Sequence, residues 1–188
     1  MKVRVATNND IKYIDTLVDW YRESAKQRGT GIAERNPDYL RKKMEQEDAV
    51  IAFDDEDNLL GFSYIETFED EKFVVNSGLI VRTDARGDGT GKKIKHKIFE
   101  LSRTKYPQAK IFSITTSLQV MKLNTELGYK PVTFSELTKS DDFWKGCKSC
   151  KNYAILTANE RKMCLCTGLV YDQLEDKFSK NNKNEEKK

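Results

Sequence analysis

The sequence has no run of apolar residues that approaches the roughly 18 needed to cross a lipid bilayer. Its first residues also lack the apolar segment of a secretory signal peptide. A membrane protein and a secreted protein are therefore not expected, and the predicted location is the cytoplasm. In that compartment the four cysteines are expected to be thiols or metal ligands rather than disulfides.

The chain also has little imbalance of charge, because 33 basic and 30 acidic residues leave a net charge of +3. Residues 179–188 hold four lysines and two glutamates, so this tail accounts for +2 and the remainder for +1. A near-neutral body gives no electrostatic reason to expect a nucleic acid or a membrane as partner. The tail has no apolar residue to bury and is predicted to be disordered.

Apolar runs separated by polar turns predict one domain in which strands and helices follow one another. The predicted order is a strand, two helices, antiparallel strands, and then strand, helix, strand, helix and strand. This order predicts an α/β (mixed α+β) fold with a central mixed, mostly antiparallel twisted sheet and helices on both faces. The expected strands are 3–6, 49–53, 59–65, 73–81, 111–116 and 129–134, and the expected helices are 11–25, one that starts at 37, 91–105 and 118–127.

The most informative segment is a glycine-rich turn between a predicted strand and the helix that follows it. Gly87, Gly89 and Gly91 let the backbone approach an anion closely, and the helix start offers free N–H groups. Lys92 and Lys93 add positive charge, so the segment predicts a cradle for a pyrophosphate. A P-loop would need a hydroxyl residue at Lys93, and a dinucleotide fingerprint would need glycine at Lys92. A glycine-rich turn without a ligand is the alternative.

The pattern Arg86-x-x-Gly89-x-Gly91, followed by a helix, a strand, a second helix and Leu127-Gly128-Tyr129, resembles the GNAT superfamily of acyltransferases. The resemblance implies the GNAT fold and acetyl-CoA, or succinyl-CoA, as acyl donor. It also implies that the loop holds the pyrophosphate through backbone N–H groups, while the preceding strand end and the later helix contact the thioester and pantetheine. The residues expected to bind the cofactor are Leu79, Ile80, Val81, Arg86, Gly87, Asp88, Gly89, Thr90, Gly91, Lys92, Ser117 and Asn124.

Acyl transfer to an amine needs a base that removes a proton from the ammonium and an acid that protonates the departing thiolate. In GNAT enzymes the acid is often a tyrosine, but the matching position here is Asn124, which donates a hydrogen bond and supplies no proton near neutral pH. Glu66 is the first candidate for the base, and a solvated acidic hairpin is the alternative. Asn76 and Ser77 are candidates to orient a water. His96, the only histidine, lies off the apolar face of its helix and is predicted to be exposed.

All four cysteines lie in a predicted C-terminal extension, residues 137–178, that follows a GNAT core of residues 1–136. Cys147-x-x-Cys150 fits a metal-binding knuckle, and Cys164-x-Cys166 on a strand would direct both sulfurs to one face. A structural zinc site is one interpretation, although the second pair departs from standard zinc-ribbon spacing. Four reduced thiols that pack as small apolar residues are the other. The apolar stretch 163–171 is expected to form a last strand or a contact in a homodimer.

Together these features predict an acyl-CoA-dependent N-acyltransferase that moves an acetyl or other short acyl group to the primary amine of a small metabolite. The cysteine-bearing extension resembles a bacterial GNAT subgroup associated with arginine-biosynthesis genes, which implies an amino acid such as glutamate as acceptor. A protein or peptide N-acetyltransferase and a non-catalytic CoA-binding GNAT-like module are the alternatives. A carboxylate on the acceptor would need a basic partner, and the candidates are Arg22, Arg28, Arg35 and Arg82.

Overall fold

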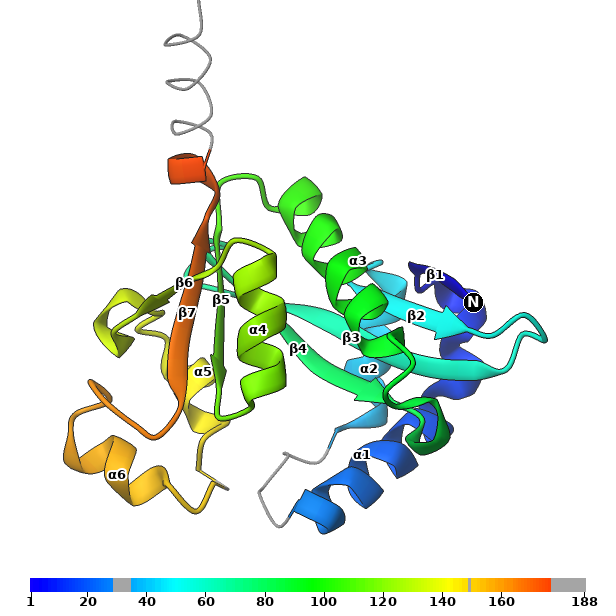
Figure 1. Cartoon of the computed structure of the whole chain (residues 1–188), viewed down its shortest axis with the longest axis horizontal. Coiled ribbons are helices and arrows are strands. Elements are labelled where there is room, and N and C mark those ends of the chain that lie inside the picture. The colour runs from blue at the N-terminus through cyan, green and yellow to red at the C-terminus, as the bar shows by residue number, and fades with distance from the viewer. Residues whose placement is uncertain (29–34, 149, 177–188) are drawn as a thin grey trace, which may run out of the picture.

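The computed structural model describes residues 1–28, 35–148 and 150–176. Within these residues a seven-stranded sheet has the order β1-β2-β3-β4-β5-β7-β6, as Figure 1 shows. Neighbouring strands are antiparallel except β4 and β5, which are parallel. The predicted mixed, mostly antiparallel sheet is therefore confirmed. The strands are β1 (Lys2–Val5), β2 (Ala49–Phe53), β3 (Leu59–Phe68), β4 (Phe73–Val81), β5 (Lys110–Thr115), β6 (Lys130–Val132) and β7 (Thr167–Asp172).

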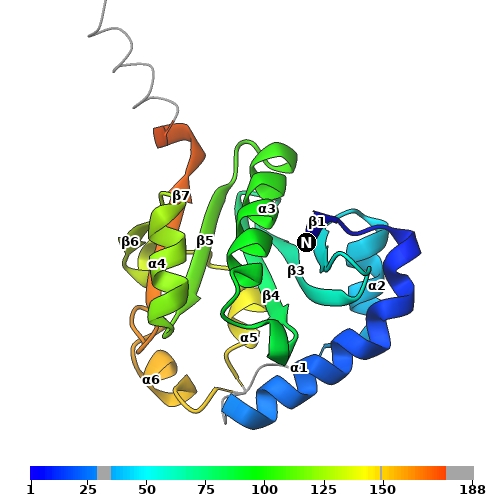
Figure 2. The same cartoon turned by 45° about the vertical axis from the view of Figure 1, so that its right-hand side comes forward.

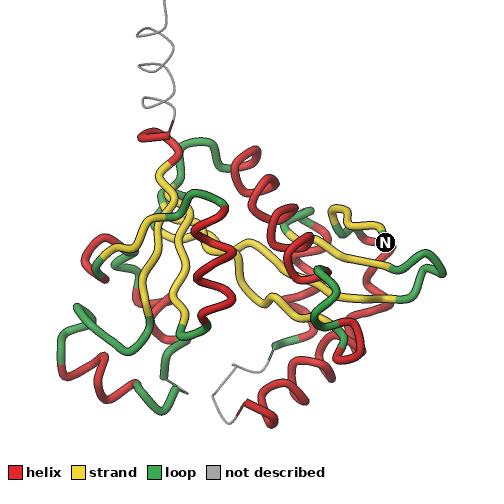
Figure 3. The backbone as a smooth tube through the Cα atoms, viewed as in Figure 1, coloured by secondary structure: helices red, strands yellow, loops and turns green. Residues whose placement is uncertain are grey.

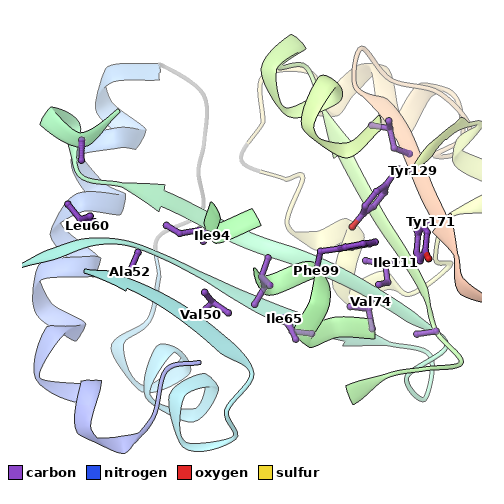
Figure 4. Close-up of a cluster of buried hydrophobic side chains, with 14 residues drawn as sticks. Val50, Ala52, Leu60, Ile65, Val74, Ile94, Phe99, Ile111, Tyr129 and Tyr171 are labelled. Carbon is purple, nitrogen blue, oxygen red and sulfur yellow. The ribbon is translucent and has the colours of Figure 1, made fainter. Parts of the chain in front are cut away.

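Helices cover both faces of the sheet. Successive side chains of β2 and β3 point to opposite sides, so apolar residues of these strands pack against helices on each face. Val50 and Ile65 belong to a core under α3, where Figure 4 shows them, whereas Ile51 and Tyr64 pack with α1 and α2. Helices α3 and α4 lie on the same face in Figures 1 and 2. In the described part of the chain no helix is long and apolar enough to cross a membrane. The helices are η1 (Asn8–Tyr13), α1 (Ile14–Arg28), α2 (Pro37–Glu45), η2 (Thr83–Ala85), α3 (Thr90–Lys105), α4 (Leu118–Glu126), η3 (Phe134–Glu136), α5 (Asp141–Lys145) and α6 (Tyr153–Ala158).

Several helix ends follow directly from local sequence signals. The side chain of Asn36 caps α2 by accepting a hydrogen bond of 2.8 Å from the N–H of Asp38. Gly128 follows α4 with a φ of +90°, a backbone conformation that glycine adopts without steric cost. The first predicted helix begins earlier than expected, as the 3-10 helix η1, because Asp10 accepts a hydrogen bond of 2.8 Å from the N–H of Thr7.

Strands β4 and β5 separate part-way along their length. They pair only over Phe73–Val75 and Lys110–Phe112, although β4 continues to Val81 and β5 to Thr115. Strand β4 also carries a β-bulge where it pairs with β3. Ser77 lies opposite Tyr64 and Ile80 lies opposite Phe62, so β4 has one residue more than β3 over this stretch. This bulge bends β4 away from β5. The backbone of β4 beyond Val75 therefore has no strand partner on its β5 side among the described residues.

The predicted extension contributes to the sheet itself. Strand β7 lies between β5 and β6 and pairs with both, so the last strand expected within 163–171 is confirmed. Between β6 and β7 the chain is mostly loop around short helices (Figure 3). This part packs on the sheet through Trp144 and Leu156, which join a third apolar cluster with Phe112 and Val170. The boundary at residue 136 stays a prediction, and the tail predicted for 179–188 lies outside the described residues.

Candidate active site

A groove of about 950 Å³ follows the separation of β4 from β5. One side is the end of β4 and the glycine-rich turn, and the other is the end of β5 and the first turns of α4. Segments far apart in the sequence thus form one elongated cavity. Most of the residues predicted to bind the cofactor line it, namely Leu79, Ile80, Val81, Arg86, Gly87, Gly89, Gly91, Lys92 and Ser117.

The glycine-rich turn has the geometry of an anion cradle. Gly87 and Gly89 have φ values of +96° and +91°, and a Cβ added at either would meet nothing within 4 Å. The backbone at these positions therefore faces open space. Gly89 is also the N-cap of α3, whose first N–H groups and positive dipole end point toward the turn. Arg86 steadies the turn by donating a hydrogen bond of 3.2 Å from Nε to the carbonyl oxygen of Val81.

Charged side chains define the mouth of the groove. The Nζ of Lys92 lies 2.6 Å from a carboxylate oxygen of Glu126, which links α3 to α4. The hydrogen bond and positive charge of Lys92 lower the pKa of Glu126. Both side chains are about half exposed, so this ion pair contributes little to stability.

Two residues of the predicted cofactor loop support the turn instead of lining the groove. The carboxylate of Asp88 accepts a hydrogen bond of 2.9 Å from the N–H of Thr90. Hydrogen bonds from the side chain and backbone of Thr90 lower the pKa of Asp88. The hydroxyl of Thr90 is buried, with its Oγ1 3.2 Å from the sulfur of Met1. These contacts fix the backbone of the turn.

Tyr21 and Arg35 line the inner end of the groove, and the buried side chain of Tyr64 lies next to them. The hydroxyl of Tyr21 donates a hydrogen bond to the carbonyl oxygen of Gly78, at the bulge of β4. Gly78 has a φ of +63°, and a Cβ there would lie 2.2 Å from the ring of Tyr64. Only glycine fits this position. The guanidinium of Arg35 lies 5.4 Å from the centre of the Tyr21 ring and 5.7 Å from that of Tyr64.

Glu66 is held beside this inner end by two hydroxyl groups. The hydroxyl of Tyr39, from α2, donates to Oε1 at 2.8 Å, and the hydroxyl of Ser77 donates to Oε2 at 2.5 Å. Burial, together with the charge and hydrogen bond of Glu66, raises the pKa of Tyr39, so its phenol stays protonated. The carboxylate is partly buried and is therefore not part of a freely solvated turn.

Asn76 lies on the opposite face of β4 from Ser77, because neighbouring side chains of a strand alternate. Its Nδ2 donates to the hydroxyl of Ser102 at 2.7 Å, and its Oδ1 accepts from Tyr129 at 3.4 Å. Asn76 is thus tied to the α3 side of the sheet. Of the two residues predicted to orient a water, only Ser77 contacts Glu66.

A second cavity of about 680 Å³ adjoins the groove, since Tyr21 and Arg35 line both. Arg22 and Lys26 also line it, so several cations surround it. Two of the four predicted carboxylate partners, Arg22 and Arg35, are therefore placed here. Arg22 also pairs with Asp19 at 2.7 Å. Arg82 pairs with Asp84 at 2.6 Å and does not line this cavity, and the side chain of Arg28 lies outside the described residues.

No protein-family model and no curated protein matches the sequence. Solved structures do match its fold. N-acetylglutamate synthase from Neisseria gonorrhoeae, complexed with coenzyme A and N-acetyl-glutamate, superposes with a TM-score of 0.61 at 20% identity. Phosphinothricin acetyltransferase from Sinorhizobium meliloti, a GNAT superfamily protein complexed with acetyl-CoA, gives 0.59 at 15% identity over 91% of this chain and 87% of its own. The chain has the GNAT fold.

The extent of these matches differs from one structure to another. The match to the Neisseria synthase covers 92% of this chain but only 35% of the synthase. Rv2747 from Mycobacterium tuberculosis, in complex with CoA, matches with a TM-score of 0.61 and 16% identity over 92% of this chain and 99% of its own. The GNAT fold predicted from the glycine-rich motif is confirmed by these structures.

Asn124, predicted to replace the GNAT tyrosine and to touch the cofactor, is fully buried on α4 and does not line the groove. Neither atom of its side-chain amide has a hydrogen-bond partner among the described residues. Its backbone oxygen accepts from the N–H of Tyr129 at 3.0 Å. The structure therefore places Asn124 behind the wall of the groove.

Two neighbouring residues of α3 are more buried than their sequence suggests. His96 is half-buried, so the prediction of an exposed histidine is wrong, because the helix packs near the N-terminal residues Met1 and Val3. Lys95 is almost fully buried, with its Nζ 5.3 Å from the centre of the Tyr129 ring. Burial lowers the pKa of Lys95 to about 8. A lysine that lies between Ile94 and His96, with Lys93 and Lys97 close by, gives no clear sequence signal of burial.

Proposed function

We propose that the chain is an acyl-CoA-dependent N-acyltransferase that uses acetyl-CoA and acts on the primary amine of a small metabolite. The observation that carries the proposal is the groove between the separated ends of β4 and β5, closed at one end by the glycine cradle. Two cavities that meet at Tyr21 and Arg35 provide one site for a long donor and another for an acceptor. Structures that share this fold hold CoA or acetyl-CoA.

The donor is expected to bind mainly through backbone groups. The N–H groups around Gly87 and Gly89, with the positive end of α3, hold the pyrophosphate. The pantetheine arm lies along Leu79–Val81, whose β5-facing edge is left without a strand partner in the described part of the chain. The thioester then reaches the bulge at Gly78. The backbone N–H groups at this bulge are suited to stabilise the negative oxygen of the tetrahedral intermediate.

Glu66 is our candidate for the base. It accepts a proton from the acceptor ammonium through the hydroxyl of Ser77, because that hydroxyl contacts Oε2 and Ser77 precedes Gly78, whereas Glu66 itself lines neither cavity. The freed lone pair on nitrogen forms a bond to the thioester carbon, and the carbon–sulfur bond breaks as the tetrahedral intermediate collapses. The nitrogen then gives its second proton to water in the open groove. The departing thiolate, with an ordinary thiol pKa of about 8.5, takes its proton from water in the open groove. The mechanism therefore needs no tyrosine at Asn124.

The acceptor is expected to carry a carboxylate next to its amine. Arg22 and Arg35 line the second cavity, and arginine binds a carboxylate through two parallel hydrogen bonds. An amino acid such as glutamate fits this arrangement, and the bound ligand of the Neisseria synthase is N-acetyl-glutamate. Succinyl-CoA is the alternative acyl donor, and the experiment below compares it with acetyl-CoA.

The test measures release of free CoA from acetyl-CoA and from succinyl-CoA across amino acids, polyamines and peptides. Turnover with glutamate or another amino acid, absent with polyamines, supports the proposal. Turnover only with peptides identifies a peptide N-acetyltransferase. Binding of acetyl-CoA by calorimetry without turnover on any acceptor identifies a non-catalytic CoA-binding module and refutes the enzyme.

A further inference from the structure

The four cysteines meet at the junction of the C-terminal segment with the sheet. Cys147 and Cys150 lie in the turn after α5, which closes through a hydrogen bond of 2.9 Å from the N–H of Cys150 to the carbonyl oxygen of Cys147. Cys164 and Cys166 lie immediately before β7. None of the four is in a disulfide, and each is half-buried.

The backbone of Asn152 joins the two pairs. Its N–H donates to the sulfur of Cys150 at 3.5 Å, and its carbonyl oxygen lies 4.0 Å from the sulfur of Cys164. A backbone N–H that points at a cysteine sulfur stabilises negative charge there. The backbone of one residue therefore contacts a sulfur from each cysteine pair.

The thiols are also close enough to affect one another. Burial raises the pKa of Cys147, and the neighbouring thiols of Cys150 and Cys164 raise it further. Burial, with the other three thiols, raises the pKa of Cys166 to about 11.

The segment that carries the cysteines has features that a bound metal ion would stabilise. The helices α5 and α6 have only five and six residues, too few to be stable without a further link. Cys147, Cys164 and Cys166 pack against an apolar cluster that includes Trp144 and Leu156. Residues 145–166 hold five basic residues (Lys145, Lys148, Lys151, Arg161 and Lys162) and one acidic residue, Glu160. Three of the cations, Lys145, Arg161 and Lys162, form ion pairs with Asp142, Asp141 and Glu160.

We propose that Cys147, Cys150, Cys164 and Cys166 together bind one Zn²⁺ ion in a tetrahedral structural site that ties the segment after β6 to the start of β7. Binding releases four protons, one from each thiol, and leaves a centre with two negative charges that the basic segment offsets. In the part of the chain that the structure describes, no group of three or more His, Cys, Asp or Glu side chains is arranged to hold a metal ion as it stands. The proposal therefore requires the four sulfurs to move closer together, by side-chain rotation, when the ion binds.

The experiment uses the full chain, produced with added zinc and purified without chelator. Zinc per chain is measured by elemental mass spectrometry, and reactive thiols are counted with a thiol reagent before and after a chelator is added. We expect about one zinc ion per chain and thiols that react only after chelation. The double variant Cys147→Ser/Cys166→Ser removes one ligand from each pair. After dialysis, its zinc content should be lower than that of the wild type by about tenfold or more. Met163→Ser is the control, because it removes an exposed sulfur beside Cys164.

Two results overturn the proposal. One is less than about a tenth of an equivalent of zinc in the wild-type chain, with all four thiols reactive before chelation. The other is a disulfide among the four cysteines, found by mass spectrometry of protein whose free thiols were blocked at lysis. Should the double serine variant fail to fold, the zinc content and thiol count of the wild-type chain are sufficient to test the proposal. Neither measurement depends on the acyltransferase assay.

Discussion

Replacing Glu66 by glutamine removes the proposed base while retaining the shape of the side chain. The amide oxygen can still accept the hydrogen bond from Tyr39, which is 2.8 Å long in the wild type, and the amide nitrogen can donate to Ser77. A general base contributes about 10²–10⁴-fold to a rate, which at about 1.4 kcal/mol per tenfold corresponds to about 3–5 kcal/mol of barrier. We therefore expect kcat for amine acylation to fall by about 10²-fold or more.

The assay is release of CoA from acetyl-CoA with the acceptor that the panel identifies, and calorimetry gives the affinity for acetyl-CoA. That affinity should stay within about twofold, because Glu66 does not line the donor groove. Glu69→Gln is the matched control, since Glu69 lies on the same hairpin and accepts hydrogen bonds from Thr138 and Lys139. Equal rates for Glu66→Gln and wild type, or equal losses in both variants, would refute the role of Glu66 as the base.

Three further predictions concern the acceptor cavity, the bulge of β4 and the first strand. Arg35→Gln should raise KM for a carboxylate-bearing acceptor by about tenfold or more, the value of a hydrogen bond to a charged group, whereas Arg82→Gln leaves it unchanged in the same CoA-release assay. Gly78→Ala should lower the free energy of unfolding by about 3 kcal/mol in urea titrations, because a Cβ meets a tyrosine ring at a positive φ; an unchanged midpoint contradicts this. Burial raises the pKa of Asp10, but hydrogen bonds from Arg4 and Thr7 outweigh it and lower the pKa overall. Its stabilisation is therefore full above the unfolded-state value of about 3.9 and lost as the pH falls through and below it, so the urea midpoint should fall less between pH 6 and 3 in Asp10→Asn than in wild type.

Local sequence signals determined the parts of this protein that depend on backbone preferences. Glycine at 87 and 89 permits the positive φ values of the cradle, and Asn36 caps α2, because these effects act within a few residues. The apolar residues at both ends of the segment 73–81 placed this strand at its observed bounds. The pattern around Arg86 therefore identified the GNAT fold and most of the groove.

Only the tertiary structure decided which side chains meet. Tyr39, from α2, donates a hydrogen bond to Glu66, from β3. This contact shows that the Glu66 carboxylate is held in place, and it could not be foreseen from the acidic hairpin sequence alone. Lys95 is buried because of the packing of α3, although a lysine is usually exposed. Strand β7 enters between β5 and β6, which brings Cys164 and Cys166 to the turn of Cys147 and Cys150. Such contacts depend on how distant segments pack, and no local propensity encodes them.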